Sequence, residues 1–122
     1  MNFPSIKDIY SGTYTPTATA ISNITSITEL ETLYIKIGDI VTVSGQMNID
    51  PTSASTLTEL YLSLPIDTNF TSVVDASGSI TSSVGNNGKI SANASEDKAI
   101  MQFIGANAAN STYAFTFQYR IK

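Results

Sequence analysis

The stretch TLYIKIGDIVTVSGQMNI, residues 32–49, decides the fold because apolar and polar side chains alternate along most of it. A period of two is typical of a β-strand with one buried face. Gly38 and Asp39 interrupt the alternation, and a glycine first in a two-residue turn favours a type II′ hairpin. We expect Tyr34 and Lys36 to point outward from this hairpin. Its buried face is expected to carry Leu33, Ile35, Ile37, Val41, Val43, Gly45, Met47 and Ile49.

Alternation of the same kind continues on both sides of the hairpin. Residues 60–64 alternate leucine with Tyr61 and Ser63 up to Pro65, which cannot donate to a sheet and should end that strand. Shorter strands are expected over residues 17–28, 70–74, 79–84, 89–93 and 99–104, and a helical turn over 95–98. In 99–104 either Met101 and Phe103 or Ile100 and Ile104 face inward. The most regular strand, over residues 113–121, places on one face Tyr113, Phe115, Phe117, Tyr119 and Ile121.

These strands predict an all-β domain. About eight or nine short strands at a spacing of roughly ten residues are typical of a sandwich or barrel. We expect an antiparallel β-sandwich of the jelly-roll type, with an immunoglobulin-like sandwich as the alternative. Residues 1–12 are expected to form an N-terminal arm, and residues 13–122 a single domain.

Composition limits the functions open to this chain. It has 122 residues, a net charge of −4 and only 13% charged residues, with Ser, Thr and Asn at most polar positions. Six scattered basic residues form no stripe that could neutralise a phosphate backbone, so nucleic-acid binding is not expected. The sequence shows no signal peptide and no apolar stretch of membrane-spanning length, so membrane insertion is not expected either.

Catalytic groups are scarce. The chain has no histidine and no cysteine, which removes Ser-His and Cys-His chemistry and the usual zinc ligands. Asp39, Asp50, Asp67 and Asp75 all fall in expected turns, where aspartate commonly bonds to the backbone. No stretch has the carboxylate spacing of a calcium loop. We therefore expect a protein that is not an enzyme and needs no metal or cofactor.

Several short motifs, taken in order, resemble one family. They are YTPT (residues 14–17), YIKIGDIVTVSG (34–45), LSLPI (62–66), GKISA (88–92), DKA (97–99) and FTFQY (115–119). This ordered set is similar to the β-sandwich tip domain at the ends of bacteriophage tail fibres, head fibres and spikes. The resemblance covers the chain from about Tyr14 onward. It departs from the family in that only about a dozen residues precede the match, where fibres usually carry a shaft or attachment domain.

The resemblance implies a virion-surface protein made in the host cytoplasm. Its implied partners are further copies of itself in a homotrimer, other virion proteins, and a glycan or protein of the host surface. The implied role is a fibre tip, a spike or a capsid decoration. A carbohydrate-binding or adhesin module without catalytic activity is the alternative, for which scattered tyrosines are the only sequence support.

Two sets of residues are candidates for contact with partners. Both faces of strand 99–104 are partly apolar, and tyrosine is enriched at protein interfaces, so we expect an interface at Tyr34, Tyr61, Met101 and Phe103. Strand alternation groups the loops near residues 38, 65–69, 85–88 and 105–111 at one end, and those near 51–55, 75–78 and 95–98 at the other. This grouping depends on residues 70–74 forming a strand. Receptor binding is expected at the first end, through Asn69, Asn86, Asn87, Asn107 and Asn110.

Overall fold

The computed structural model describes residues 9–122 and confirms the expected all-β, antiparallel fold. Ten strands and one short 3₁₀ turn, η2 (Val73–Asp75), make up its regular structure. The strands are β1 (Ile9–Tyr14), β2 (Ala18–Ser22), β3 (Ile24–Glu29), β4 (Thr32–Ile37), β5 (Ile40–Pro51), β6 (Leu57–Leu62), β7 (Ala76–Ser82), β8 (Asn87–Asn93), β9 (Lys98–Ile104) and β10 (Ser111–Arg120).

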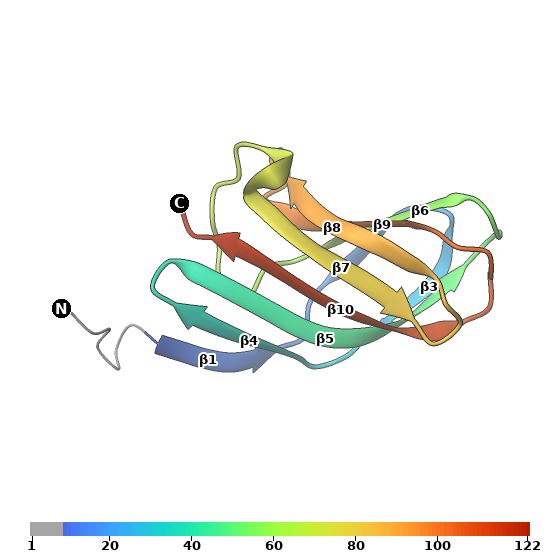
Figure 1. Cartoon of the computed structure of the whole chain (residues 1–122), viewed down its shortest axis with the longest axis horizontal. Helices are drawn as coiled ribbons and strands as arrows, with labels where there is room; N and C mark the ends of the chain where they lie inside the picture. Colours follow the sequence, from blue (N-terminus) through green and yellow to red (C-terminus); the bar gives the residue numbers. More distant parts are fainter. Residues whose placement is uncertain (1–8) are drawn as a thin grey trace.

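All ten strands belong to one curled sheet with the order β1-β4-β5-β10-β7-β8-β9-β6-β2. Strand β3 lies off this path and pairs with the second half of β5, whose first half pairs with β4. The sheet curls over on itself, and in Figure 1 strands β8, β9 and β6 lie above β7, β10 and β5. One layer is therefore built from β1, β4, β5, β10 and β7, and strands β8, β9, β6 and β2 curl around to the other side of the core.

The core is filled mainly from β5 and β10. Tyr113, Phe115, Phe117 and Tyr119 are all buried, as their alternation predicts, and Phe117 stacks between its two aromatic neighbours on the strand. Gly78 on β7 faces this row where the backbones of β7 and β10 approach closely. Met101 and Phe103 of β9 close the core from the other layer.

The β4–β5 hairpin forms with the expected two-residue turn. Gly38 has a φ of +59°, whereas Asp39 does not have a positive φ, as a type II′ turn requires. Its expected face assignment on β4 is wrong. The turn pairs Ile37 with Ile40 and Ile35 with Thr42, so the isoleucines of β4 share a face with the outward residues of β5.

The expected strand at residues 70–74 is also wrong. These residues form a loop that ends in η2, where the Ser72 hydroxyl accepts from the Val74 N–H and the Asp75 carboxylate accepts from the Ser72 N–H. The helical turn expected at 95–98 is wrong too, because residues 94–97 form a non-helical turn and Lys98 already belongs to β9. The chain makes one strand fewer here than expected. The loops that follow therefore lie at the opposite ends of the strands from those expected.

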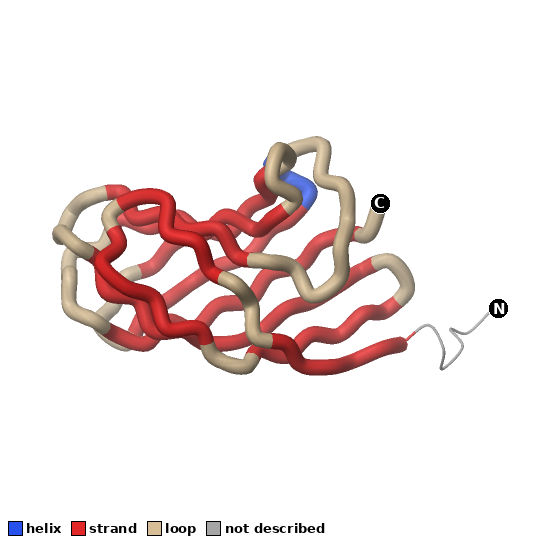
Figure 2. Tube along the Cα trace, turned by 180° about the vertical axis from the view of Figure 1, so that it is seen from behind, coloured by secondary structure: helices blue, strands red, loops and turns tan. Residues whose placement is uncertain are grey.

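Loops gather at both ends of the strands (Figure 2). Loops 52–56, 83–86 and 105–110 share one end, where the Ser55 N–H donates to the Gly105 carbonyl at 2.7 Å. Loops 38–39, 63–75 and 94–97 share the other, where the Phe70 N–H donates to Asp97 at 2.8 Å. This corrects the expected grouping, which had assigned residues 38 and 65–69 to the end that carries 85–88 and 105–111.

The last part of the expected N-terminal arm is a strand. Ile9 to Gly12 belong to β1. This strand pairs with β4 along its whole length and forms one edge of the sheet. Residues 1–8 of the expected arm lie outside the described residues.

Candidate functional site

An exposed apolar surface lies on the outer side of β1, β4 and the first half of β5. Leu33 is 62% exposed, Ile37 50% and Ile35 38%, so the three aliphatic residues of β4 form a column facing solvent. Ile9 and Ile40 flank Ile37 on the neighbouring strands and are also exposed. We call this surface the β4 face; its outward residues are Ile9, Ser11, Thr13, Leu33, Ile35, Ile37, Ile40, Thr42 and Ser44.

Strand register explains why these residues point outward. Tyr34 lies opposite Val43 and Lys36 opposite Val41, and both valines are completely buried. Successive residues of a strand point to opposite sides. Placing Tyr34 and Lys36 on the side of the core therefore turns Leu33, Ile35 and Ile37 to the outside.

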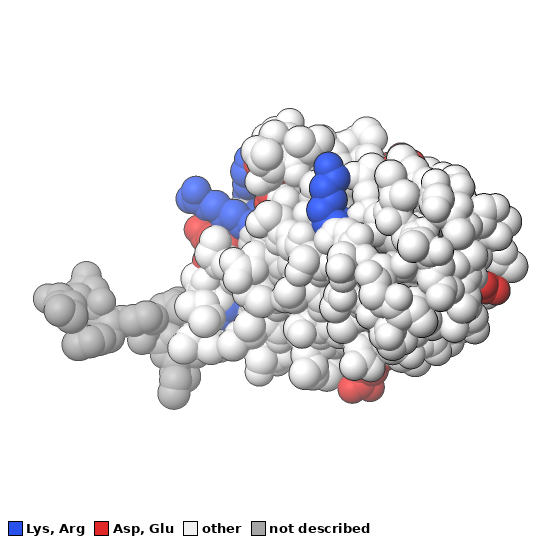
Figure 3. Space-filling view, turned by 45° about the vertical axis from the view of Figure 1, so that its right-hand side comes forward, with Lys and Arg blue, Asp and Glu red and all other residues white. Residues whose placement is uncertain are grey.

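The β4 face carries no carboxylate, although the chain as a whole is acidic. Beyond β5 the same outer surface continues over β10 and β7 with Ala114, small hydroxyl residues and glutamine, and its single charged strand residue is Arg120 beside Ile40. In the view of Figure 3, charged side chains are visible at only a few positions. Because the β4 face carries no carboxylate, electrostatic repulsion between acidic groups is weak there.

Two shallow grooves border Leu33. One, of about 540 Å³, runs toward β10 and is lined by Ser44, Ala114 and Thr116, with Glu31 at its rim. The other, of about 490 Å³, lies on the β1 side and is lined by Ser11, Thr13 and Ile35 among others. Leu33 thus stands as a ridge between two hollows on a single face.

The expected receptor-binding asparagines do not form one site. Asn69 lies at the end of the molecule opposite to the other four, with the loop 63–75. Asn87, Asn107 and Asn110 are exposed at the end formed by loops 52–56, 83–86 and 105–110.

Asn86 is buried and has a structural role instead. Its Nδ2 donates to the Tyr113 hydroxyl at 2.9 Å and to the Asn107 carbonyl at 2.8 Å. Its exposed fraction is 3%, because the loop over Gly105 packs against it. Asn86 therefore ties the β7–β8 turn to the 105–110 loop and is not available to a receptor.

The expected interface residues are divided in the same way. Met101 and Phe103 point into the core, and Ile100 and Ile104 occupy outward positions of β9. Tyr61 is half-buried on the outer side of β6, where its hydroxyl accepts from Asn93 Nδ2 at 3.2 Å.

Tyr34 belongs to an aromatic cluster on the inner side of β1 and β4. Its ring centroid lies 5.9 Å from those of Tyr10 and Tyr14, and Tyr10 is 57% exposed. Tyr14 donates to the Ser63 carbonyl at 3.0 Å, and burial raises the pKa of its hydroxyl far above the usual value. Tyr119, which donates to the Ile66 carbonyl at 2.7 Å, has its pKa raised by burial too. These hydroxyls anchor the loop after β6 and stay protonated.

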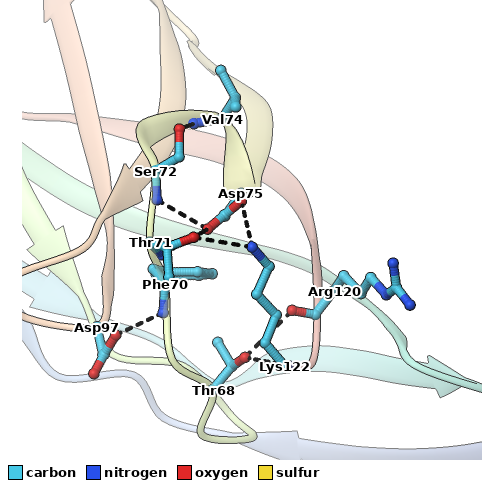
Figure 4. Close-up of polar contacts among 9 residues, drawn as sticks. All are labelled: Thr68, Phe70, Thr71, Ser72, Val74, Asp75, Asp97, Arg120 and Lys122. Atoms are coloured by element: carbon cyan, nitrogen blue, oxygen red, sulfur yellow. Dashed lines mark hydrogen bonds and ion pairs between the residues drawn. The ribbon is translucent and has the colours of Figure 1, made fainter.

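A polar network holds the end of the chain near η2 (Figure 4). The Asp75 carboxylate accepts from the Thr71 N–H at 2.7 Å and pairs with Lys122 Nζ at 3.0 Å. The pKa of Asp75 is lowered from 3.8 to about 2, mainly by the hydrogen bond from Thr71 and next by the contact with Lys122. Thr68 accepts from the Lys122 N–H at 2.8 Å and donates to the Arg120 carbonyl at 3.3 Å. The network ties the C-terminal residue to the loop that leads into η2.

Among residues 9–122, no three His, Cys, Asp or Glu side chains come together as metal ligands would. Within the same range the structure has no helix with the length and hydropathy needed to cross a membrane. Comparison of the chain with protein-family models, with curated proteins and with solved structures gave no match.

Sequence reasoning missed the β4 face although a signal for it was present. The alternation within a single strand predicts that the side with the larger aliphatic residues is buried, and for β4 this prediction is wrong. A two-residue turn at Gly38 and Asp39 fixes the pairing of Ile35 with Thr42, however. Leu33, Ile35 and Ile37 therefore cannot share a face with Val41 and Val43, and one set must be exposed.

Proposed function

We propose that this protein is a non-catalytic, self-associating structural protein of a bacteriophage surface, acting as a fibre tip, spike or capsid decoration. The observation that carries the proposal is the β4 face, a carboxylate-free apolar surface on a rigid all-β scaffold. Large exposed apolar patches on soluble proteins commonly mark interaction sites. The ordered sequence motifs support the phage assignment and the homotrimer.

Partner binding is assigned to the exposed loops at the ends of the strands. Loops on a rigid scaffold commonly carry recognition residues, because their side chains vary without disturbing the core. Asn87, Asn107 and Asn110 form the exposed asparagine-rich end, and we propose it for contact with the host surface or the capsid.

Solution mass is the first test. Light scattering coupled to size exclusion should give a mass near three times 13.0 kDa. A subsequent heating series should show that the assembly resists dissociation. A stable monomer would remove the self-associating virion protein from consideration.

A carbohydrate-binding module is the second candidate, favoured by Tyr10 and Tyr34. Their rings lie 5.9 Å apart with a tilt of 39°, and Tyr10 exposes more than half of its surface. Exposed aromatic rings on β scaffolds can stack against sugars, since one end of tyrosine is apolar and the other is polar. Binding on a glycan array that Tyr10→Ala abolishes would favour this function, and the absence of any glycan binding would exclude it.

A further inference from the structure

We infer that the β4 face is the surface through which copies of this chain pack against one another, with the β4 faces turned toward the axis of the trimer. This inference rests on the proposed self-association and adds its location. The occupant is a second copy of the same chain, and the contact is made by side chains rather than by extension of the sheet at its edge.

Exposed apolar area is the first reason. Five aliphatic side chains of the β4 face are between 38% and 62% exposed. Together they present on the order of 500 Å² of apolar surface, near the upper end for a monomer. Covering such a surface with another apolar one is favourable because it removes both from water.

The outer side of the whole layer has the size of a specific interface. Strands β1, β4, β5, β10 and β7 lie side by side in the sheet. At roughly 16 Å² of flat sheet per residue, their outer side has a footprint on the order of 600 Å². A standard interface takes about 800 Å² of accessible surface from each partner. Projecting side chains give this side more accessible area than its footprint, so it is large enough for such an interface, with the β4 face as its apolar part.

Shape favours a second copy over an unrelated partner. Leu33 projects from the face between a groove bordered by Ala114 and Thr116 and another bordered by Ser11 and Thr13. In a three-fold ring, one part of the contact surface of each copy meets a different part of the next copy's surface. Ridge and grooves on the same face meet this need, because Leu33 of each copy can enter a groove of the next.

The distribution of charge also favours another copy of the chain as the partner. The chain has a net charge of −4, so two copies repel each other at long range. The outer side of β8, β9 and β6 carries Glu59, Lys89 and Lys98, whereas the nine outward residues of the β4 face are all uncharged. The nearest charged side chains border this face: Glu31 lines the groove between Leu33 and β10, and Arg120 lies beside Ile40. Packing at the β4 face therefore buries few charges.

Lysine substitutions give the main test, by sedimentation equilibrium or light scattering on the full chain. Leu33→Lys and Ile37→Lys place a charge in the contact and should reduce the mass to 13.0 kDa at concentrations where the wild type is assembled. Ile104→Lys is the matched control. Ile104 is also an outward aliphatic residue of a strand, 65% exposed against 62% for Leu33, and its variant should keep the wild-type mass.

Chemical cross-linking provides a second measurement that does not depend on weakening the assembly. The chain has no cysteine, so one introduced thiol is a unique label. Ile35→Cys, at the centre of the β4 face, should be linked between copies by a short bismaleimide, and Ile104→Cys should not. Cross-linking at residue 104 and none at residue 35 would overturn the inference.

The outcomes separate the two proposals. A wild-type monomer overturns both the self-association and its location. A wild-type oligomer that survives both lysine substitutions in folded protein overturns the β4 face alone and leaves the proposed function standing. Loss of assembly in the β4-face variants with retention in the Ile104 variant supports both.

Discussion

Asn86 shows how one buried amide can hold two loops together. It bonds to the Tyr113 hydroxyl and to the backbone of Asn107, and so links a hairpin turn, a core strand and a surface loop. Buried polar groups are costly when they lose their partners, since water cannot replace them. This residue type was expected at a receptor site, and only burial distinguishes its two possible roles.

Replacement of Asn86 should therefore destabilise the fold. We expect Asn86→Ala to lower the free energy of unfolding by about 1–3 kcal/mol, because the Tyr113 hydroxyl loses its buried donor. Asn110→Ala is the control; Asn110 is exposed, and its variant should lie within about 0.5 kcal/mol of the wild type. Urea unfolding of the three proteins measures both values, and equal effects would contradict the structural role of Asn86.

Asp75 should make stability depend on pH in the acid range. Its pKa in the folded protein is about 2, below its ordinary value of 3.8. A carboxylate with a lowered pKa binds fewer protons in the folded state, so its contribution is present above pH 4 and is lost as the pH falls through the folded pKa. We expect the Tm of the wild type to exceed that of Asp75→Asn at pH 6, and the difference to shrink steadily between about pH 4 and pH 2. A difference independent of pH would show that the charge is not responsible.

Among the elements, strands and turns were the predictable part of this fold. The alternation in β5 and β10 predicted both the strands and their buried faces, because large inward residues occupy every second position. The alternation in β4 predicted the strand but not its inner face. Apolar residues lie on the side of β4 that faces solvent, and only pairing with β5 reveals which side that is. Residues 70–74 were mistaken for a strand because valine-rich stretches favour β structure, whereas here Ser72 and Asp75 cap a short turn.

Two glycines on different elements should respond differently to alanine. At Gly78 on β7, a Cβ would collide with the Thr116 carbonyl and with Phe117, so Gly78→Ala must push β7 from β10. At Gly38 a Cβ meets nothing, and the cost comes from the positive φ alone. We expect Gly78→Ala to destabilise the protein by about 1–3 kcal/mol, and Gly38→Ala by about 1 kcal/mol. Thermal unfolding would contradict this account if Gly38→Ala were the more damaging substitution.

For the whole molecule, assembly and stability are linked. The β4 face is exposed in the single chain and covered in the proposed assembly, so association should stabilise the folded state by mass action. The asparagine-rich loops lie at one end of the strands, away from the side that packs. The β4 face follows from the register that the two-residue turn imposes, whereas the grouping of the loops depends on the conformation of residues 70–74, which the sequence pattern did not reveal.

The Tm of the wild type should rise with protein concentration for the same reason. A series over two decades of concentration, followed by circular dichroism, should show this rise for the wild type and for Ile104→Lys. Leu33→Lys should unfold at a Tm that does not change with concentration. A concentration-independent Tm in the wild type would argue against a stable assembly of folded copies.

The position of β10 has a consequence for how the chain is made. In the sheet β10 lies between β5 and β7, although it follows both along the sequence. During synthesis the β4–β5 hairpin and the β7-β8-β9 meander can form as they leave the ribosome, because each contains only neighbouring strands. The edges of β5 and β7 that face each other stay unpaired until residues 111–120 emerge and fill the place between them. A nascent chain stalled before that point presents two open edges to other nascent chains, and chaperones that bind exposed strands are most needed at this stage.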